Sequence, residues 1–483
     1  MAAPPPLADR VLVVVFDGLR PDLIAGRMPH LHGFADSAVW FTEASSVFPS
    51  MTRVATTATA TGCWPGAHGV VGNMFHAPAL KPGAPLDTSN RGDLETAERA
   101  YGGIITARTL GERLAAAGKR LGVVHAGSVG SAYLLNHRAP QLGHWTVSAH
   151  SRAASLTPDW VARAEAEIGP LPDTDELPRL GAIAFAEAAA RALALAEDGP
   201  DVAVVWFPEP DTSFHYLELG SEKTAMAMAN VDAAFARLVE AARSGPRGAR
   251  TAIIAMSDHG QISINRVWEI GEDMRADGLS VSHRPDGHGL ALTRGVSGEL
   301  RCLTGDHGAL RAAADWLMGR PEIGMIFARD DLVAELPGTL PLSAVHLTHP
   351  RTAELKYICR SDSGPDHYGL PGSTVITAGP PVGGGMHGGL NRHELNTVLM
   401  VAAPGAPGGR RDDRPCGLID IAPTVLSLLG LPAEGAQGAA LPIEPMPAAV
   451  ETDHLHAARE GFEQHLTRKV IDGRAYLHEG GRG

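Results

Sequence analysis

Three stretches of the chain are continuous runs of hydrophobic residues that lead into an acidic residue. They are RVLVVVFD, which ends at Asp17, VAVVWFPEPD, which ends at Asp211, and TAIIAMSDHG, which contains Asp258. Runs of this length, rich in β-branched residues and without a polar face, are typical of parallel strands buried on both sides. A fourth run, LGVVHAG at 121–127, fits the same pattern without an acid at its end.

Helical patterns separate these runs, notably at 181–196 and 224–243. The alternation predicts an α/β fold with a doubly wound, mostly parallel central sheet flanked by helices. Ligands of such sheets gather at the carboxyl ends of the strands, which is where the three acids lie. A single Asp after a strand is explained equally well by a turn or a helix cap. Three of them, two with a histidine nearby, favour a binding site.

The pattern changes between residues 265 and 375, where the sequence is rich in Gly and Pro and its elements are mixed. We interpret 265–375 as a cap insertion. Within it, Asp306-His307 imitates the Asp258-His259 pair, but no clear buried strand precedes it, so we expect Asp306 to cap a helix at 309–317. The strand pattern resumes at STVITAGPP and NTVLMVAAPG. The catalytic core is therefore expected at 1–264 and 376–450. Residues 451–483 form a C-terminal tail that we expect to be helical or loosely packed.

Composition narrows the class of protein. A formal net charge of −13 argues against a broad cationic surface for a nucleic-acid polymer. It leaves room for a small anionic substrate, because bound divalent metals reverse the field locally. The four cysteines are far apart and lack CxxC spacing, as expected for reduced thiols. The first residues show no signal-peptide pattern and hydrophobic runs are only strand-length, so we expect a cytoplasmic protein without a membrane span.

Six side chains have the chemistry and placement of metal ligands: Asp17, Asp211, His215, Asp258, His259 and His387. Asp211 and His215 have the spacing D-x-x-x-H, which places both on one face of a helix. His387 lies in GGGMHGGL, where glycines allow close approach of the backbone. Three carboxylates and three imidazoles suit Zn²⁺, with Mn²⁺ as an alternative. Six ligands would crowd one ion, so we expect two, with open positions for a phosphoryl group and a nucleophile.

Thr52 is the candidate nucleophile. Pro49 breaks the chain, and Thr52 then begins a run of small residues through Ala60 that can form a helix. A hydroxyl at a helix N-terminus lies at the positive end of the dipole, which favours an alkoxide, and a bound metal lowers its pKa further. The alternative is that Ser50 or Thr52 only caps this helix.

In their order along the chain, these segments resemble the type I phosphodiesterase/nucleotide pyrophosphatase branch of the alkaline phosphatase superfamily. The segments that carry the resemblance are VVVFDGLRPD, VFPSMT, TGCWPGAHGVVGN, EPDTSFH, MSDHG, MHGG and DIAPTVLSLLGL. Each is weakly specific alone, whereas the ordered set is specific and spans most of the chain outside the proposed cap. The resemblance implies an alkaline-phosphatase-like fold. It also implies a metal-dependent phosphoester hydrolase that acts on a small phosphorylated substrate such as a nucleotide, through a phosphothreonine intermediate.

The resemblance also implies roles for single residues. One metal ion would be bound by Asp211, His215 and His387. The second would be bound by Asp17, Asp258, His259 and the oxygen of Thr52. Asn73, in HGVVGN, matches the family asparagine that donates a hydrogen bond to a phosphoryl oxygen.

The chain departs from the family pattern directly after the proposed nucleophile. Eukaryotic-type nucleotide pyrophosphatases read Thr-Phe-Pro-Asn there, whereas this chain reads Thr-Arg-Val-Ala from residue 52. Arg53 is a candidate phosphate contact, with an outward, solvated arginine as the alternative. His288 and His367, both in the proposed cap, are candidate substrate contacts. The substrate therefore stays open: a phosphonate hydrolase of the phosphonoacetate type and a phosphomonoesterase are alternatives, and a non-catalytic, metal-stabilised binding module is the alternative of another class.

Overall fold

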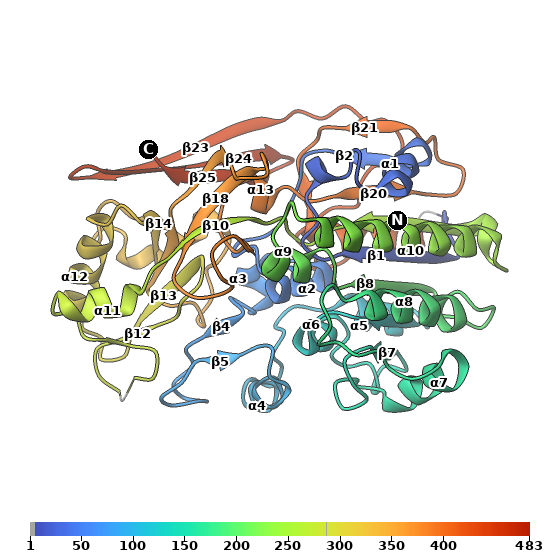
Figure 1. Ribbon diagram of the computed structural model, residues 1–483, viewed down its shortest axis with the longest axis horizontal. Helices are drawn as coiled ribbons and strands as arrows, with labels where there is room; N and C mark the ends of the chain where they lie inside the picture. The colour runs from blue at the N-terminus through green and yellow to red at the C-terminus, as the bar shows by residue number, and fades with distance from the viewer. Residues whose placement is uncertain (1–4, 286) are drawn as a thin grey trace.

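A computed structural model describes residues 5–285 and 287–483, and an eight-stranded sheet forms its largest element (Figure 1). In order across the sheet, the strands are β21 (Arg410–Asp412), β2 (Val39–Phe41), β20 (Leu399–Ala402), β9 (Thr251–Met256), β1 (Arg10–Phe16), β8 (Val202–Phe207), β6 (Leu121–His125) and β7 (Trp145–Ser148). From β9 to β7 all neighbours are parallel, and β20 is antiparallel to both of its neighbours. The predicted mostly parallel sheet is confirmed.

The central strand β1 is buried on both faces. Its residues 11, 13 and 15 pack into a core shared with α2 (Thr52–Thr61) and α14 (Ile421–Leu428). Its residues 12, 14 and 16 pack into a second core shared with α8 (Leu180–Ala189) and α10 (Glu222–Ser244). Because helices cover both faces, the sheet is doubly wound, as the uninterrupted hydrophobic run of β1 predicts.

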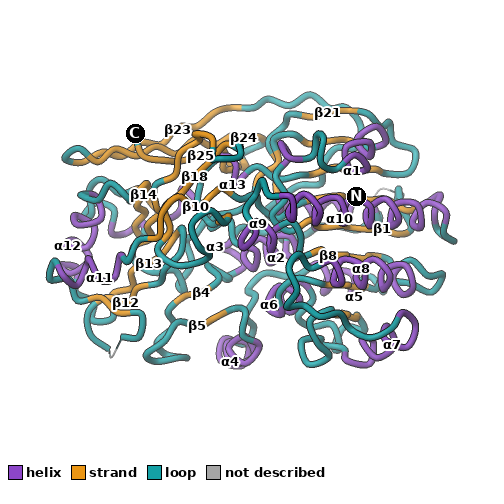
Figure 2. Tube along the Cα trace, in the orientation of Figure 1, coloured by secondary structure: helices purple, strands orange, loops and turns teal. Residues whose placement is uncertain are grey.

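Eight further α-helices lie outside the segment 265–375 among the described residues. They are α1 (Pro29–Phe34), α3 (Pro65–His68), α4 (Arg91–Tyr101), α5 (Leu110–Ala116), α6 (Val129–Leu135), α7 (Pro158–Ile168), α9 (Asp211–Leu217) and α13 (Arg392–Leu395). Figure 2 shows helices gathered around the large sheet on the right, with strands and loops more prominent at the upper left. The helix predicted at 224–243 lies within α10. The one predicted at 181–196 is α8, which continues as a π-helical turn over Ala190–Ala194.

The segment 265–375 builds a sheet of its own beside the large one. Across this sheet the strands are β11 (Val281–Ser282), β12 (Leu290–Leu292), β13 (Ser297–Cys302), β16 (Leu355–Cys359), β14 (Ile323–Ala328) and β15 (Leu340–Pro341). All of these strands except β15 contribute to a third core, which they share with α11 (Ile270–Ala276) and α12 (His307–Met318). The Asp306 carboxylate accepts hydrogen bonds from the amides of Gly308 and Ala309 at 2.8 and 3.2 Å. It caps α12, as predicted.

A four-stranded sheet adjoins these two, in the order β17 (Ser361–Pro365), β18 (Pro371–Ile376), β10 (Ile262–Val267) and β19 (Gly385–Met386). The segment STVITAGPP begins within β18, which pairs in parallel with β10. It therefore does not resume the large sheet, contrary to the expectation from its hydrophobic pattern, whereas β20, in NTVLMVAAPG, does. Two pairs of short strands also form: β3 (Ala44–Ser45) with β22 (Cys416–Gly417), and β4 (Met74–Phe75) with β5 (Leu86–Asp87).

The C-terminal tail is an antiparallel sheet, so the expectation of a helical or loosely packed tail is wrong. Its strands are β23 (Glu451–Arg459), β24 (Phe462–Ile471) and β25 (Arg474–Arg482). Both connecting turns pair an acidic residue with a glycine, and all four of these residues have positive φ: 48° and 85° at 460–461, 48° and 75° at 472–473. Leu466 and Tyr476 are buried under the sheet, which fixes it to the rest of the molecule.

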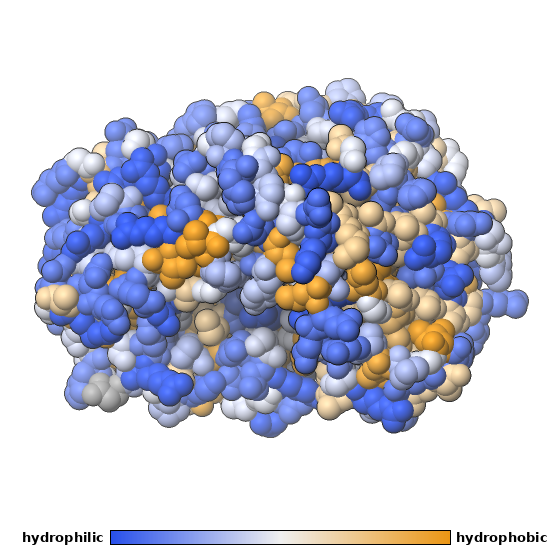
Figure 3. Space-filling view, in the orientation of Figure 1, coloured by the Kyte–Doolittle hydropathy of each residue, from blue (hydrophilic) through white to orange (hydrophobic). Residues whose placement is uncertain are grey.

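The surface and the cysteines were also covered by sequence expectations. Figure 3 shows a mostly hydrophilic face with hydrophobic residues in small, separate groups. Among the helices of the described residues, none has the length and hydrophobicity needed to cross a membrane. Cys63, Cys302, Cys359 and Cys416 are all free thiols.

Candidate metal centre

The three acids predicted at strand ends meet at one edge of the large sheet. Asp17 directly follows β1, Asp258 lies two residues after β9, and Asp211 is the first residue of α9, shortly after β8. Strands β8, β1 and β9 are neighbours, so their carboxyl ends bring the three carboxylates together.

The backbone at this edge is tightly packed. The Asp211 amide donates to the Asp17 carbonyl at 3.0 Å, and the Gly18 amide donates to Asp258 Oδ1 at 3.1 Å. Gly18 has a φ of +72°, and a Cβ there would lie 3.0 Å from the Asp211 Cβ. A glycine is therefore required for the two acidic segments to approach each other.

The first group of ligand atoms comprises Asp211, His215 and His387, all within 4.8 Å of one another. Asp211 Oδ1 lies 3.4 Å from His215 Nε2 and 3.7 Å from His387 Nε2. The opposite ring nitrogens are engaged elsewhere: His215 Nδ1 lies 2.7 Å from the Gly385 carbonyl, and His387 Nδ1 lies 2.6 Å from the Ser50 carbonyl. A ring that donates from Nδ1 has its Nε2 lone pair directed at the cluster, which is the arrangement found in metal-ligating histidines.

The second group comprises Asp17, Asp211 and His259, again within 4.8 Å. His259 Nε2 lies 3.6 Å from Asp17 Oδ1 and 3.2 Å from Asp258 Oδ2. The resemblance implied Asp17, Asp258 and His259 for this group. The geometric group has Asp211 in place of Asp258, which contacts it through His259. Asp211 is thus within reach of both groups. The rings of His259 and His387 stack at 3.6 Å between centroids, which joins the two groups.

Burial sets the electrostatics of the cluster. Burial, reinforced by the neighbouring carboxylates, raises the pKa of Asp17 and of Asp258 well above the usual value. Burial also opposes ionisation of Asp211, but His215 outweighs it and lowers the pKa of Asp211. Burial lowers the pKa of His259 to about 4. A neutral imidazole is the form of histidine that binds a metal ion. A divalent cation would offset the repulsion between the crowded carboxylates.

Two carboxylate oxygens in the cluster fit a cation. Asp17 Oδ2 accepts a hydrogen bond from Trp206 Nε1 at 2.9 Å, and Asp258 Oδ1 accepts one from the Gly18 amide. Their other oxygens, Asp17 Oδ1 and Asp258 Oδ2, are buried and accept no hydrogen bond from the described residues. Both face His259 Nε2. Buried oxygens without a hydrogen bond destabilise the fold unless a ligand binds them. These carboxylate oxygens and the nearby imidazole nitrogens together suit divalent metal ions.

Thr52 opens α2 beside this cluster. Its Oγ1 lies 3.0 Å from His259 Nε2. The N-cap of α2 is Met51, and the Ser50 hydroxyl donates to the Gly389 carbonyl and accepts from the Gly388 amide, each at 3.0 Å. Neither hydroxyl caps the helix, so the capping alternative is removed. The Thr52 hydroxyl instead faces His259, one of the candidate ligands.

Asn73 and Arg53 are linked through Thr88, close to Thr52 in the fold. Thr88 Oγ1 donates to the Asn73 carbonyl at 2.8 Å and accepts from Arg53 Nε at 2.8 Å. Asn73 Oδ1 is buried and lacks a hydrogen-bond partner among the described residues. Arg53 is only 14% exposed, with Nη2 3.9 Å from Asp87 Oδ1. The outward, solvated position considered for Arg53 is therefore not observed.

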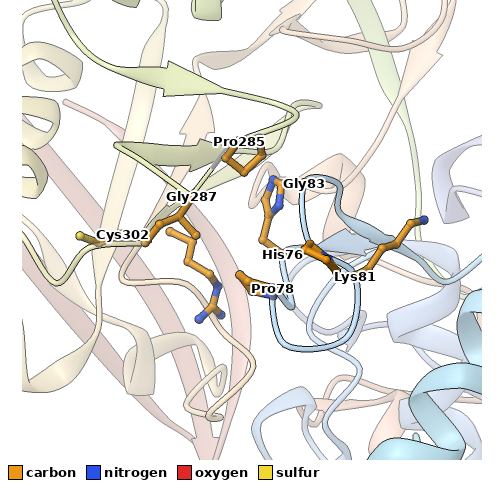
Figure 4. A pocket seen from close by; sticks show the side chains of 10 residues that line it. His76, Pro78, Lys81, Gly83, Pro285, Gly287 and Cys302 are labelled. Carbon is orange, nitrogen blue, oxygen red and sulfur yellow. The ribbon is translucent and has the colours of Figure 1, made fainter.

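The two candidate cap histidines lie in different surroundings. His367 Nε2 is 3.2 Å from Glu218 Oε2, at the end of α9, the helix that carries two ligands. His288 lies on the exposed loop between β11 and β12, next to Gly287. Gly287, His76, Lys81 and Cys302 line a cavity of about 530 Å³ (Figure 4). None of the six metal-ligand candidates lines that cavity.

Sequence reasoning missed the residues that orient the candidate ligands. Trp206 binds the Asp17 carboxylate, Gln261 binds that of Asp211, and the carbonyls of Ser50 and Gly385 face the histidine rings. Ser50 was considered only as a cap. No spacing rule identifies such residues, because their partners are distant in sequence. The glycines around His387 were the one available signal.

Comparison with known proteins places the chain among phosphoester hydrolases. Residues 11–312, more than half of the chain, match the family described as type I phosphodiesterase / nucleotide pyrophosphatase. Murine ectonucleotide pyrophosphatase/phosphodiesterase 5 is similar in structure, with a TM-score of 0.61 and 16% identity over 89% of this chain and 97% of that chain. An inactive threonine-to-alanine variant of that murine protein, in complex with AMP, gives a TM-score of 0.60 at the same identity and coverage. The curated proteins searched gave no match.

Proposed function

The chain belongs to the type I phosphodiesterase/nucleotide pyrophosphatase family and hydrolyses phosphoric esters, and from this premise we propose a phosphodiesterase or nucleotide pyrophosphatase that uses Thr52 beside two metal ions. The observation that carries the proposal is the 3.0 Å separation between Thr52 Oγ1 and His259 Nε2, at the border of six potential ligands. A hydroxyl so close to clustered carboxylates and imidazoles suits nucleophilic attack on phosphorus.

One ion is assigned to Asp211, His215 and His387, and the other to Asp17, Asp258 and His259. Mixed carboxylate and imidazole ligands favour Zn²⁺, with Mn²⁺ as the alternative. Such ions, when bound, lower the pKa of a hydroxyl and offset the charge of a phosphoryl group. The Nδ1 contacts of the histidines and the Trp206 hydrogen bond keep the ligand atoms facing inward.

In the proposed reaction, Thr52 Oγ1 forms a bond to phosphorus as the bond to the first ester oxygen breaks, and that oxygen leaves as an alcohol after taking up a proton. The product on the protein is a phosphothreonine ester. Water then attacks phosphorus, the bond to Oγ1 breaks, and the threonine hydroxyl is restored. A diester substrate is thus converted to an alcohol and a phosphomonoester.

Neighbouring donors complete the site. Asn73 is assigned to a phosphoryl oxygen, on which its amide would offset developing charge. The Arg53 guanidinium, fixed at Nε by Thr88, is assigned to a second phosphoryl oxygen or to a neighbouring phosphate. His367 is proposed to contact the leaving group because it lies against the end of α9. The same role is proposed for His288, on the cap loop.

A nucleotide is the proposed substrate. The murine relative with the same fold was obtained with AMP, the product expected from a nucleotide diester or pyrophosphate. The metal ions, Asn73 and Arg53 would recognise the phosphate, and the nucleoside would extend toward the segment 265–375.

The test is hydrolysis of three substrates by the purified protein: an aryl phosphodiester, an aryl phosphomonoester and phosphonoacetate. Each is assayed as purified, after chelation, and after restoration with Zn²⁺ or Mn²⁺. The proposal expects diester turnover that chelation abolishes and metal restores. Preference for the monoester or for phosphonoacetate would replace the diesterase assignment. Full metal occupancy without turnover of any substrate would favour the binding module.

A further inference from the structure

Gln261 is a fully buried residue three positions after Asp258, and it is not itself one of the metal-ligand candidates. Its Nε2 donates to the Asp211 carboxylate at Oδ1 and, at 3.3 Å, to the Asp211 carbonyl. One side-chain amide therefore binds both the backbone and the side chain of the acid that lies within reach of both ligand groups.

The same amide also packs against the support of a second ligand. A Cβ on Gly385 would lie 2.4 Å from Gln261 Oε1, so the glycine backbone sits directly against the amide. The Gly385 carbonyl is the group that faces His215 Nδ1 at 2.7 Å. On its other side, the Gln261 carbonyl accepts from Arg20 Nη1 at 3.1 Å. Gln261 thus fills the space between the Asp211 carboxylate and the backbone that orients His215.

The chemistry of the amide suits this position. A carboxylate oxygen has more than one lone pair, so Asp211 Oδ1 can accept from Gln261 and still face His215 and His387, 3.4 and 3.7 Å away. An uncharged donor fixes the carboxylate without adding a positive charge, which a lysine or arginine would add and which would repel a bound cation. The second amide atom, Oε1, is buried and has no hydrogen-bond partner among the described residues, a cost that a purely structural glutamine would not need to bear.

We propose that Gln261 is a positioning residue for the metal centre, and that it orients Asp211 for the ion bound with His215 and His387. This inference rests on the proposed two-metal function. It assigns to a non-ligand side chain a share of the metal affinity of the site.

The variant Gln261→Met tests it, because methionine has similar length and volume but neither donates nor accepts strongly. Zn²⁺ affinity is measured by titrating chelator-treated protein in competition with a chromophoric chelator, at a temperature where the variant is folded by circular dichroism. Loss of a residue that orients a ligand should weaken binding at one site about 10- to 100-fold. Should the methionine variant fail to fold, Gln261→Asn, which withdraws the amide by one methylene, carries the same prediction.

The control is Gln464→Met. Gln464, in β24 of the C-terminal sheet, is also fully buried. Its side-chain amide exchanges hydrogen bonds with the backbone of Ile326 in β14, at 2.9 and 3.0 Å. It should lose thermal stability and keep the wild-type Zn²⁺ affinity. Wild-type affinity in Gln261→Met, or an equal loss in Gln464→Met, overturns the inference. A wild-type protein that binds no metal would instead refute the proposed function, and the two failures are thereby separated.

Discussion

Thr52→Val removes the proposed nucleophile and keeps the shape of the side chain. Threonine and valine are both β-branched, so the first turn of α2 should tolerate the exchange. The structural loss is one hydrogen bond, the 3.0 Å contact between Oγ1 and His259 Nε2. Because Met51 occupies the N-cap position, no helix cap is lost. The free energy of unfolding should therefore change by no more than about 0.5–1.5 kcal/mol.

Activity should respond far more strongly than stability. Without the hydroxyl no phosphothreonine forms, and only water held near the substrate is left to attack. Removal of a catalytic nucleophile commonly costs a factor of about 10⁴ or more in kcat. A factor of about 10⁴ corresponds to about 5.4 kcal/mol of transition-state stabilisation. The valine variant should thus lose several times more free energy from the reaction than from the fold.

The assay is steady-state hydrolysis of an aryl phosphodiester, with metal content and thermal unfolding measured on the same samples. Thr52→Ser is the matched variant, since it restores a hydroxyl and should recover a measurable part of the rate. A tenfold loss of kcat corresponds to only about 1.4 kcal/mol of activation free energy. If the valine variant holds both metals and keeps more than about a tenth of the wild-type kcat, the nucleophile lies elsewhere.

Three further outcomes are expected. Trp206→Phe removes the donor to Asp17 Oδ2 and should weaken metal binding about 10- to 100-fold. The control Trp268→Phe loses a similar hydrogen bond to Asp273 and should leave metal affinity unchanged. Equal losses of affinity in the two variants would contradict the role of Trp206. Chelation should lower the free energy of unfolding by about 2.7 kcal/mol for each site, if the free metal concentration was 100 times the Kd of that site before chelation. An unchanged urea midpoint would argue against bound metal. Burial lowers the pKa of His125 to about 3 from 6.5, so unfolding takes up a proton and stability is lost as the pH falls from 6.5 toward 3. In chelated protein, His125→Phe should remove about 2 kcal/mol of the loss between about pH 7.5 and about pH 5, and identical losses by urea unfolding would refute it.

The sequence was most informative for features that depend on local patterns of hydrophobic and polar residues. The hydrophobic run of β1 has no polar face, and this indicated a strand buried on both sides with Asp17 at its carboxyl end. Strand order then brought Asp17, Asp211 and Asp258 together, because β8, β1 and β9 are neighbours. The spacing of Asp211 and His215 likewise predicted their shared face on α9.

Pairwise contacts across the fold could not be predicted in the same way. Trp206 reads as one more hydrophobic residue of a buried strand, and nothing in its neighbours shows that its indole faces Asp17. Gln261 reads as a turn residue after Asp258, although its partner is 50 positions away. Such contacts depend on which strands become neighbours, and a single sequence does not state that order.

The C-terminal sheet was predictable and was missed. Residues 451–459 alternate in exposure along β23, and the pairs at 460–461 and 472–473 place an acidic residue before glycine. Both features are hairpin signals, since glycine and its neighbour adopt positive φ readily in a tight turn. In STVITAGPP the error was different: a strand was identified, but its sheet depends on pairing with β10.

The central claim is that six side chains between residues 17 and 387 enclose two divalent cations. Its most direct test is a crystal structure of the protein loaded with Zn²⁺, with anomalous diffraction recorded on both sides of the zinc absorption edge. Two zinc peaks are expected, one bordered by Asp211, His215 and His387 and the other by Asp17, Asp258 and His259, with Thr52 Oγ1 against the second. An absence of zinc between these residues, in protein that retains phosphodiesterase activity, would contradict the account.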